Sequence, residues 1–232
     1  SGANIAAGTF SGYFRDDSLN AEDFIVKRVL PYSNQQYAVT TGGPIVVDKL
    51  HYFVGYEYER EPSTVTHNSP YPSLNVDLTS TRSQHKPNAR VDGQLTNNMR
   101  LSLMGYLWRD YVPIDGTQTT TGGAVNHPAN AIAFNKFAES ASATVTNVFS
   151  SSVFNELKVG WAANHWDMHP TFAYTSSMLA GARSPLANTL QISPVYTFTS
   201  FNVGGGTNYP QLIGQDVYTV RDNVSLSANL AG

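Results

Sequence analysis

The stretch of residues 41–60, TGGPIVVDKLHYFVGYEYER, constrains the fold more than any other part of the chain. Two glycines, a proline and the Asp48-Lys49 pair supply turn chemistry, and a strictly alternating segment follows them. One face of that segment is apolar or aromatic: Leu50, Tyr52, Val54, Tyr56, Tyr58. The other face is polar except at its phenylalanine: His51, Phe53, Gly55, Glu57, Glu59. A strand of about ten residues exceeds the roughly five or six usual in globular proteins and matches what a tilted strand needs to cross a bilayer.

The composition leaves the chain few charges for a soluble surface. Charged residues make up 13% of the 232 residues, roughly half the usual share, and the net charge is −3. The sequence has no basic block, which argues against nucleic acid as a partner, and no cysteine, which excludes disulfide scaffolds and thiolate metal sites. It also lacks an apolar run of the roughly 18 residues that a membrane helix needs. Because the chain starts with Ser1 and shows no signal peptide, we expect a mature piece or an internal fragment.

Alternation and turn residues predict eight strands with connections of two lengths. The strands are expected at residues 9–15, 34–41, 50–60, 89–96, 99–109, 140–149, 156–164 and 215–228. Long connections are expected at 16–33, 61–86, 110–135 and 167–214, and short turns at Gly43-Pro44, Asn97-Asn98 and 150–152. In the first long connection, SLNAEDF predicts a helical turn capped by Ser18 or Asn20. The orientation of residues 99–109 stays open, because both of its faces carry apolar side chains.

Connections that run long, short, long, short are typical of an outer-membrane barrel, with short periplasmic turns and long extracellular loops. Strands with one apolar and one polar face fit lipid outside and a wet lumen inside. The pattern therefore predicts an all-β, antiparallel, up-and-down transmembrane β-barrel. A secreted soluble β-sandwich, such as a carbohydrate-binding or adhesin module, remains the alternative, because its strands also alternate.

Five segments follow one another along the chain: SGAN at residues 1–4 with GTFSGYFRDDSLNAEDF at 8–24, the hairpin at 41–60, RVDGQLT at 90–96, NELKVGW at 155–161 and YTVRDNVSL at 218–226. In this order they resemble Oar-like TonB-dependent outer-membrane receptors. Ala3 and Thr41 depart from the Thr and Leu of the family pattern. The resemblance covers nearly the whole chain.

The resemblance implies a barrel of about 22 strands with a plug domain upstream. Residues 1–232 would then be the N-terminal part of that barrel, an open sheet of about eight strands from which the plug and the remaining strands are absent. The implied partners are the plug of the full-length chain, the TonB complex through the plug, outer-membrane lipid and an unknown transported ligand. The implied location is the outer membrane of a Gram-negative type bacterium, and the implied role is the wall and the ligand-catching loops of a transporter.

Aromatic side chains in the long connections are the candidate substrate-binding residues: Tyr71, Tyr111, Tyr174, Tyr209. They could stack on or hydrogen-bond to a glycan, peptide or siderophore, although tyrosine is also common in exposed loops that bind nothing. Charged residues on the polar strand faces are expected to contact the plug or one another: Glu57, Glu59, Arg90, Asp92, Glu156, Lys158, Arg221.

The sequence contains no catalytic constellation, so we expect neither an enzyme nor a cofactor. His165, Asp167 and His169 alternate and would point one way from an extended chain, as ligands of a divalent metal do. A wet strand end explains them as well, because no fourth ligand is indicated, and a hydrolase that uses the two histidines is the remotest of the hypotheses. No Gly-x-Ser-x-Gly elbow occurs, and the glycines at 204–206 lack the lysine of a phosphate-binding loop.

Overall fold

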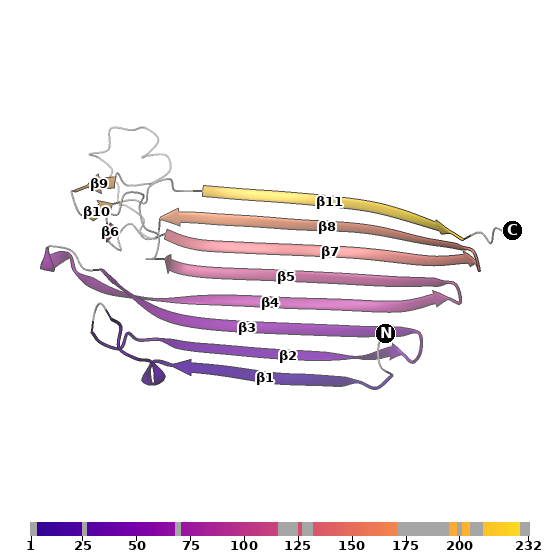
Figure 1. Ribbon diagram of the computed structural model, residues 1–232, viewed down its shortest axis with the longest axis horizontal. Helices are drawn as coiled ribbons and strands as arrows, with labels where there is room; N and C mark the ends of the chain where they lie inside the picture. Colours follow the sequence, from indigo (N-terminus) through magenta and orange to yellow (C-terminus); the bar gives the residue numbers. More distant parts are fainter. Residues whose placement is uncertain are drawn as a thin grey trace.

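The computed structural model describes residues 4–24, 27–67, 71–115, 125–126, 132–170, 195–198, 201–204 and 211–227. Eight strands form its main sheet: β1 (Ala7–Asp16), β2 (Ser33–Val46), β3 (Leu50–His67), β4 (Val76–Thr96), β5 (Met99–Asp115), β7 (Ile132–Ser150), β8 (Val153–Pro170) and β11 (Gln211–Leu226). They lie side by side in chain order, and every neighbouring pair is antiparallel (Figure 1). The expected all-β, up-and-down sheet of eight strands is confirmed.

Short turns lie at one end of the sheet and long connections at the other (Figure 1). The turn end holds the connections between β2 and β3, β4 and β5, and β7 and β8, whereas the remaining connections lie at the loop end. The expected Gly43-Pro44 turn is wrong, because both residues belong to β2 and the register shifts between Pro44 and Val46. The reversal comes at residues 47–49, where Asp48 has a φ of 62°. An aspartate tolerates this left-handed conformation better than most residues.

The strands are longer than the sequence indicated. β3 has 18 residues and β4 has 21, so much of the expected loop at residues 61–86 is paired strand. These segments are rich in Ser, Thr and Pro and lack an apolar face, which is the reason that alternation did not reveal them. Their pairing rests on backbone hydrogen bonds, which need no hydrocarbon contact.

A single 3-10 turn, η1 (Asp17–Leu19), follows β1. A helical turn is therefore present, but earlier than expected: it begins at Asp17, residues 20–24 are not helical, and the expected caps Ser18 and Asn20 are wrong. Asp16 is the N-cap, and its Oδ1 accepts a hydrogen bond of 3.1 Å from the backbone N–H of Ser18. A carboxylate at this position satisfies an N–H group that the turn itself leaves unpaired.

Cross-strand register separates the sheet into an apolar face and a polar face. One row of directly opposite residues on the apolar face runs Val54, Ala89, Gly105, Ala141, Trp161, Tyr218. One row on the polar face runs Asp92, Ser102, Thr144, Lys158, Arg221. The register also settles β5, whose Leu101 and Leu103 lie on the apolar face and whose Ser102 lies on the polar face.

No second layer of protein covers the apolar face in the part of the chain that the structure describes. Tyr56 is 37% exposed and Val159 is 41% exposed, as are many other large apolar side chains of this face. The buried apolar cluster is small and lies at the loop end, where Ile132, Phe134 and Met168 pack with Val112. A β-sandwich would bury its apolar faces against each other, so this alternative is wrong.

Three short strands form a separate sheet at the loop end: β6 (Val125–Asn126), β9 (Val195–Thr197) and β10 (Phe201–Gly204). β10 pairs with β9 and, in parallel, with β6 (Figure 1). The connection after β5 is therefore joined to the connection after β8. Among the described residues, no helix is long and apolar enough to span a membrane.

Candidate functional site

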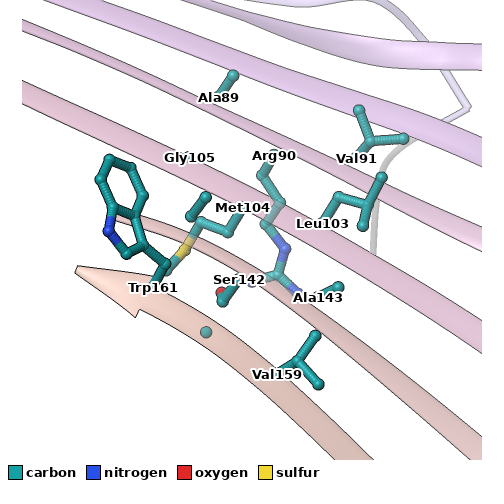
Figure 2. Close-up of a pocket in the computed structure, with 12 residues that line it drawn as sticks. Ala89, Arg90, Val91, Leu103, Met104, Gly105, Ser142, Ala143, Val159 and Trp161 are labelled. Carbon is teal, nitrogen blue, oxygen red and sulfur yellow. The ribbon is translucent and has the colours of Figure 1, made fainter. Parts of the chain in front are cut away.

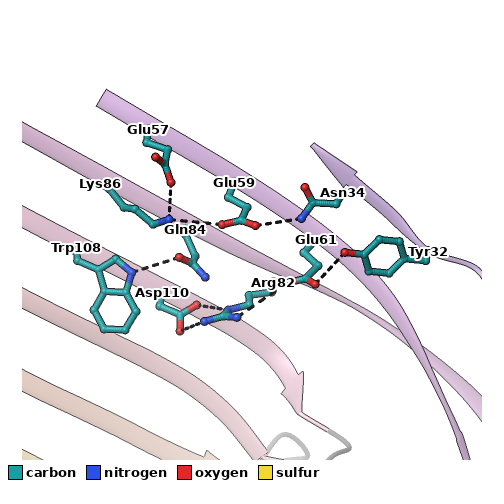
Figure 3. Close-up of polar contacts among 10 residues, drawn as sticks. All are labelled: Tyr32, Asn34, Glu57, Glu59, Glu61, Arg82, Gln84, Lys86, Trp108 and Asp110. Atoms are coloured by element: carbon teal, nitrogen blue, oxygen red, sulfur yellow. Dashed lines mark hydrogen bonds and ion pairs between the residues drawn. The ribbon is translucent and has the colours of Figure 1, made fainter. Parts of the chain in front are cut away.

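The polar face carries a network of ion pairs and hydrogen bonds near the loop end, which we call the loop-end network (Figure 3). It comprises Tyr32, Asn34, Glu57, Glu59, Glu61, Arg82, Gln84, Lys86, Trp108 and Asp110. Its strongest contact is bidentate: Arg82 donates to both carboxylate oxygens of Asp110, at 2.7 and 3.0 Å. Asp110 is only 2% exposed, so its negative charge depends on this partner.

Two further acidic residues of the loop-end network share one lysine. Lys86 Nζ lies 2.5 Å from Glu57 Oε1 and 3.5 Å from Glu59 Oε2. Asn34 donates to the other oxygen of Glu59 at 3.1 Å, and Trp108 donates to Gln84 at 3.4 Å. Each carboxylate of this network is thus paired with a cation or a hydrogen-bond donor from a neighbouring strand.

Tyr32 and Arg82 lie beyond the apolar segment of β3, next to Glu61. Burial, and after it the negative charge of Glu61, raises the pKa of the Tyr32 phenol. The phenol therefore stays protonated and donates to Glu61 Oε1 at 3.1 Å. The hydrogen bonds to Asp110 raise the pKa of Arg82 further above its ordinary value. Both groups act as fixed donors and not as proton carriers.

A second polar feature is a hollow of roughly 620 Å³ on the same face near the turn end, which we call the turn-end hollow. Four basic residues line it: Lys49, Arg90, Arg100, Lys158. Two aspartates, Asp48 and Asp92, and the hydroxyls of Ser102, Ser142, Thr144 and Thr146 complete most of the polar lining. Only Arg90 among the basic residues has a carboxylate partner in the described residues: it donates to Asp92 at 2.7 and 2.9 Å.

The segment before β1 lies against this hollow. Asn4 Nδ2 donates to the Asp48 carboxylate, and Asn4 Oδ1 lies 3.0 Å from the Asp48 N–H and from His51 Nε2. Gly43 also lies close to this segment, because a Cβ there would lie 2.7 Å from the Cα of Ala6. The chain therefore enters β1 from the polar side of the sheet.

The apolar face has a hollow of its own, of roughly 600 Å³ (Figure 2). It lies over the small residues Ala89, Gly105 and Ala141, and Trp161, Val159 and Leu103 rise around it. Almost all of its lining is apolar, and it opens on the face that carries the exposed hydrocarbon side chains. Its chemistry suits contact with hydrocarbon and offers no catalytic group.

A belt of aromatic and ionisable side chains crosses the apolar face just loop-ward of this hollow. Directly opposite residues give the row Tyr37, Tyr58, His85, Arg109, Phe137, His165. The Arg109 guanidinium lies 4.2 Å above the Phe137 ring, and the Phe137 and His165 ring centroids are 4.7 Å apart. Amphipathic rings of this kind are enriched where a membrane meets water.

The four expected tyrosine sites are not brought together in the described structure. Tyr71 lies between β3 and β4 and is 55% exposed. Tyr111 is not in a loop: it belongs to β5, and its register opposite Ser83 and Asn135 places it on the apolar side. Tyr174 and Tyr209 lie outside the described residues.

His165, Asp167 and His169 do share one side of β8, as their alternation predicts, and that side is the one with the belt. His169 Nδ1 lies 3.4 Å from Asp167, whereas the nearest carboxylate to His165 Nε2 is Asp216 on β11, at 3.8 Å. Among the described residues, no group of three or more side chains could hold a metal ion. The metal hypothesis therefore receives no support.

The charged residues expected on the polar faces do occupy one face of the sheet, and two sets contact one another: Glu57 and Glu59 with Lys86, and Arg90 with Asp92. Sequence reasoning missed Arg82, Lys86, Arg100 and Asp110. Arg82, Lys86 and Asp110 stand in segments expected to be loops, and Arg100 belongs to the strand whose orientation stayed open. Their place on the polar face follows only from the full length of the strands and from the register between them.

The chain also matches a known family. The family described as outer membrane beta barrel domain matches residues 1–77 and 74–229, which is nearly the whole chain. The chain belongs to this outer-membrane β-barrel family. No curated protein and no solved structure matches it.

Membership in the outer-membrane β-barrel family assigns the two faces. The apolar face contacts lipid, and the belt lies where lipid gives way to water. The polar face lines the lumen, so the loop-end network and the turn-end hollow face the interior of the barrel. In barrels of this kind short turns are periplasmic and long loops are external. The turn-end hollow therefore lies toward the periplasm.

Proposed function

We propose that this chain forms wall and external loops of a TonB-dependent, Oar-like transporter in the outer membrane of a Gram-negative type bacterium. The observation that carries the proposal is the path of residues 4–6, which approach the sheet from the lumen side and contact Asp48 and His51. In a receptor of this kind the plug lies inside the lumen and runs into the first strand. The path into β1 suits such a connection.

We further propose that residues 1–232 are the first eight strands of a larger barrel, with the plug upstream and more strands downstream. Among the described strands, β1 and β11 each have one neighbour in the sheet, so each presents an edge that no described strand pairs. They lie at opposite sides of the open sheet (Figure 1). Exposed edges of this length call for further pairing, which additional strands of the same chain would supply.

In this role the chain performs no catalysis and holds no cofactor. The plug, coupled to the TonB complex, opens the passage, and the wall provides the lumen surface along which the ligand moves. The external connections catch the ligand, and Tyr71, Tyr174 and Tyr209 remain candidates for contact with a glycan, peptide or siderophore.

A depletion experiment tests the transporter. Cells with and without the full-length gene are grown in a mixture of oligosaccharides, peptides and ferric siderophores, and each component left in the medium is quantified by mass spectrometry. We expect the gene to accelerate the loss of at least one component, and deletion of TonB to abolish the difference. Equal depletion with and without TonB would identify a passive pore and overturn the proposal.

A further inference from the structure

We propose that the turn-end hollow binds a small anionic ligand through its carboxylate or phosphate groups. The inference rests on the proposed function in one respect, since it takes this ligand to be the molecule that passes through the barrel. It goes beyond that function by assigning a site and a chemical class.

The first argument is an asymmetry of charge pairing along the lumen face. In the loop-end network, Glu57, Glu59, Glu61 and Asp110 all lie within 4.0 Å of a cation. Near the turn end, by contrast, basic side chains lack acidic partners. In the described part of the chain, no carboxylate lies within that distance of the side chains of Lys49, Arg100, Lys158 and Arg221.

The second argument is the position of two of these cations. Lys158 on β8 lines the hollow, and Arg221 on β11, which is outside the lining, lies directly opposite Lys158 on the same face of the sheet. Like charges at directly opposed positions of an antiparallel pair destabilise it. Glu156 occupies the next position of the lumen face, opposite Asn223, and makes no ion pair among the described residues. Arg221 donates to Asn223 at 3.2 Å, a neutral partner that leaves its charge in place.

The third argument is the supply of neutral donors beside the cations. Thr144 lies directly opposite Lys158 on one side and Ser102 on the other, and Thr146 lies opposite Arg100. Adjacent strands are about 4.8 Å apart, so these hydroxyls and cations form a row of donors that separate carboxylate or phosphate groups of one small polyanion can reach. Hydroxyl and charged donors together are what carboxylates and phosphates require.

The size of the hollow also fits a small molecule. Its roughly 620 Å³ lies within the range of about 300–1,000 Å³ typical of ligand sites. The lining holds four basic side chains and two carboxylates, so an anion gains net attraction. Arg90 is paired with Asp92, which leaves Lys49, Arg100 and Lys158 as the lining cations without a carboxylate partner among the described residues. Arg100 donates to Gln94 at 2.7 Å, a neutral partner that leaves its charge in place.

Calorimetric titration of the full-length protein in detergent with citrate tests the site, with inorganic phosphate and neutral glucose as comparison probes. We expect citrate to bind, glucose not to bind, and the affinity to fall as salt is added. The double variant K158Q/R221Q should weaken citrate binding about tenfold or more, since hydrogen bonds to charged groups are lost. K136Q is the matched control: Lys136 carries the same charge on the same face but lies over the Phe134 and Trp166 rings. Its affinity should stay within about twofold of the wild type.

Thermal unfolding of the same proteins separates binding from folding. The double variant should be at least as stable as the wild type without ligand, because it removes an opposed pair of like charges. A large loss of stability would show that the two cations have partners within the protein and would overturn the proposal. Equal citrate affinity in all variants would also overturn the proposal. The proposal would fail as well if the wild-type protein did not bind citrate and an acidic segment of its own chain cross-linked to Lys158. TonB-independent uptake would overturn the transporter and leave the anion site standing.

Discussion

Asp110 shows how a single residue of the lumen wall depends on its partner. Its carboxylate is nearly inaccessible to solvent, yet both of its oxygens accept hydrogen bonds from Arg82. A buried charge without a partner is strongly destabilising, whereas a paired one contributes little beyond an apolar substitute. The loop-end network is therefore sensitive to loss of one member at a time.

Arg82→Met tests this dependence. Breaking a fully buried ion pair costs about 3–5 kcal/mol, and we expect about 2 kcal/mol here, because solvent reaches part of the guanidinium. Arg82 is 40% exposed in its side chain. Urea unfolding in lipid vesicles measures the change. Arg15→Met is the control: Arg15 makes no ion pair among the described residues, donates to the neutral Asn20 at 3.3 Å and lies 5.1 Å from the centroid of the Tyr32 ring, so its loss should cost about 1 kcal/mol or less. Restoration of stability by the further change Asp110→Leu would complete the argument, and an unaltered R82M protein would contradict it.

Ser18→Ala tests the cap of η1. The hydrogen bonds from Ser18, first from its side chain and then from its backbone N–H, hold the pKa of Asp16 below its ordinary value. A lowered folded-state pKa means that the charged cap stabilises the turn above the unfolded pKa, and that this contribution is lost as pH falls through the folded pKa. Carbon-13 NMR titration of the Asp16 carboxyl should show its midpoint move upward in S18A. An unchanged midpoint would remove Ser18 as the cause.

At the level of strands, the sequence predicts the segments whose apolar face contacts hydrocarbon and misses the strand segments that have no such face. The apolar segment of β3, Leu50 to Tyr58, was placed correctly because lipid demands alternation there. Beyond it, β3 and β4 continue without an apolar face, so their polar residues read as a loop. Pro87, which follows that stretch, lies inside β4, although proline is rare inside a sheet. The pairing between β4 and β5 is interrupted between His85 and Asn88, which accommodates this proline.

The candidate site was predictable only where strand alternation alone places a residue. Glu57, Arg90 and Lys158 were placed on the lumen face from alternation alone, and the register confirms them. Their partners were not predictable, since a cross-strand neighbour depends on the register of two strands. The hollow near the turns was equally hidden, because it combines residues from β3 to β8 and the segment before β1.

Gly43→Ala should displace the segment before β1. The added Cβ would lie 2.7 Å from the Ala6 backbone, so Ala6 and the residues before it must shift away from β2. Overpacking of this kind typically costs about 1–3 kcal/mol. Limited proteolysis in detergent should show faster cleavage near the N-terminus. Gly105→Ala is the control, because its nearest atom would be 3.9 Å away, and its cleavage rate should match the wild type. Equal rates in all three proteins would contradict the contact.

Arginine substitutions on the two sides of the sheet test the assignment of lipid and lumen. Val159→Arg places a charge in the middle of the lipid-facing row and should cost about 2–4 kcal/mol in a bilayer. Ser140→Arg, on the lumen side opposite Tyr106, should cost less than about 1 kcal/mol because the charge stays in water. Urea unfolding of the two variants in the same vesicles gives the comparison. Equal costs would show that the apolar face does not meet hydrocarbon.

At the scale of the whole molecule, the described residues form an open sheet with an uncovered apolar face and two unpaired edges. Among the described residues, only the small cluster around Ile132 is a buried apolar core. Stability therefore has to come from lipid and from closure of the sheet, and not from the packing of layers.

Expression of residues 1–232 alone tests this dependence. We expect aggregation in the absence of detergent, because the edges of β1 and β11 offer unpaired backbone groups to other copies. Size-exclusion chromatography with light scattering gives the readout. The full-length chain, folded in the same detergent, should elute as a closed monomer. A monodisperse, detergent-free preparation of the short chain would contradict both the membrane contact and the need for more strands.

The height of the wall has a consequence for recognition from outside the cell. Residues 60–67 of β3 pair with residues 76–83 of β4, so a rigid ribbon extends roughly 25 Å along the strands past the apolar segment. Antibodies raised against unfolded peptides of these segments should bind intact cells poorly, because the backbone groups that they recognise are hydrogen-bonded to the neighbouring strand. Immunisation with the folded hairpin should yield antibodies that label the surface.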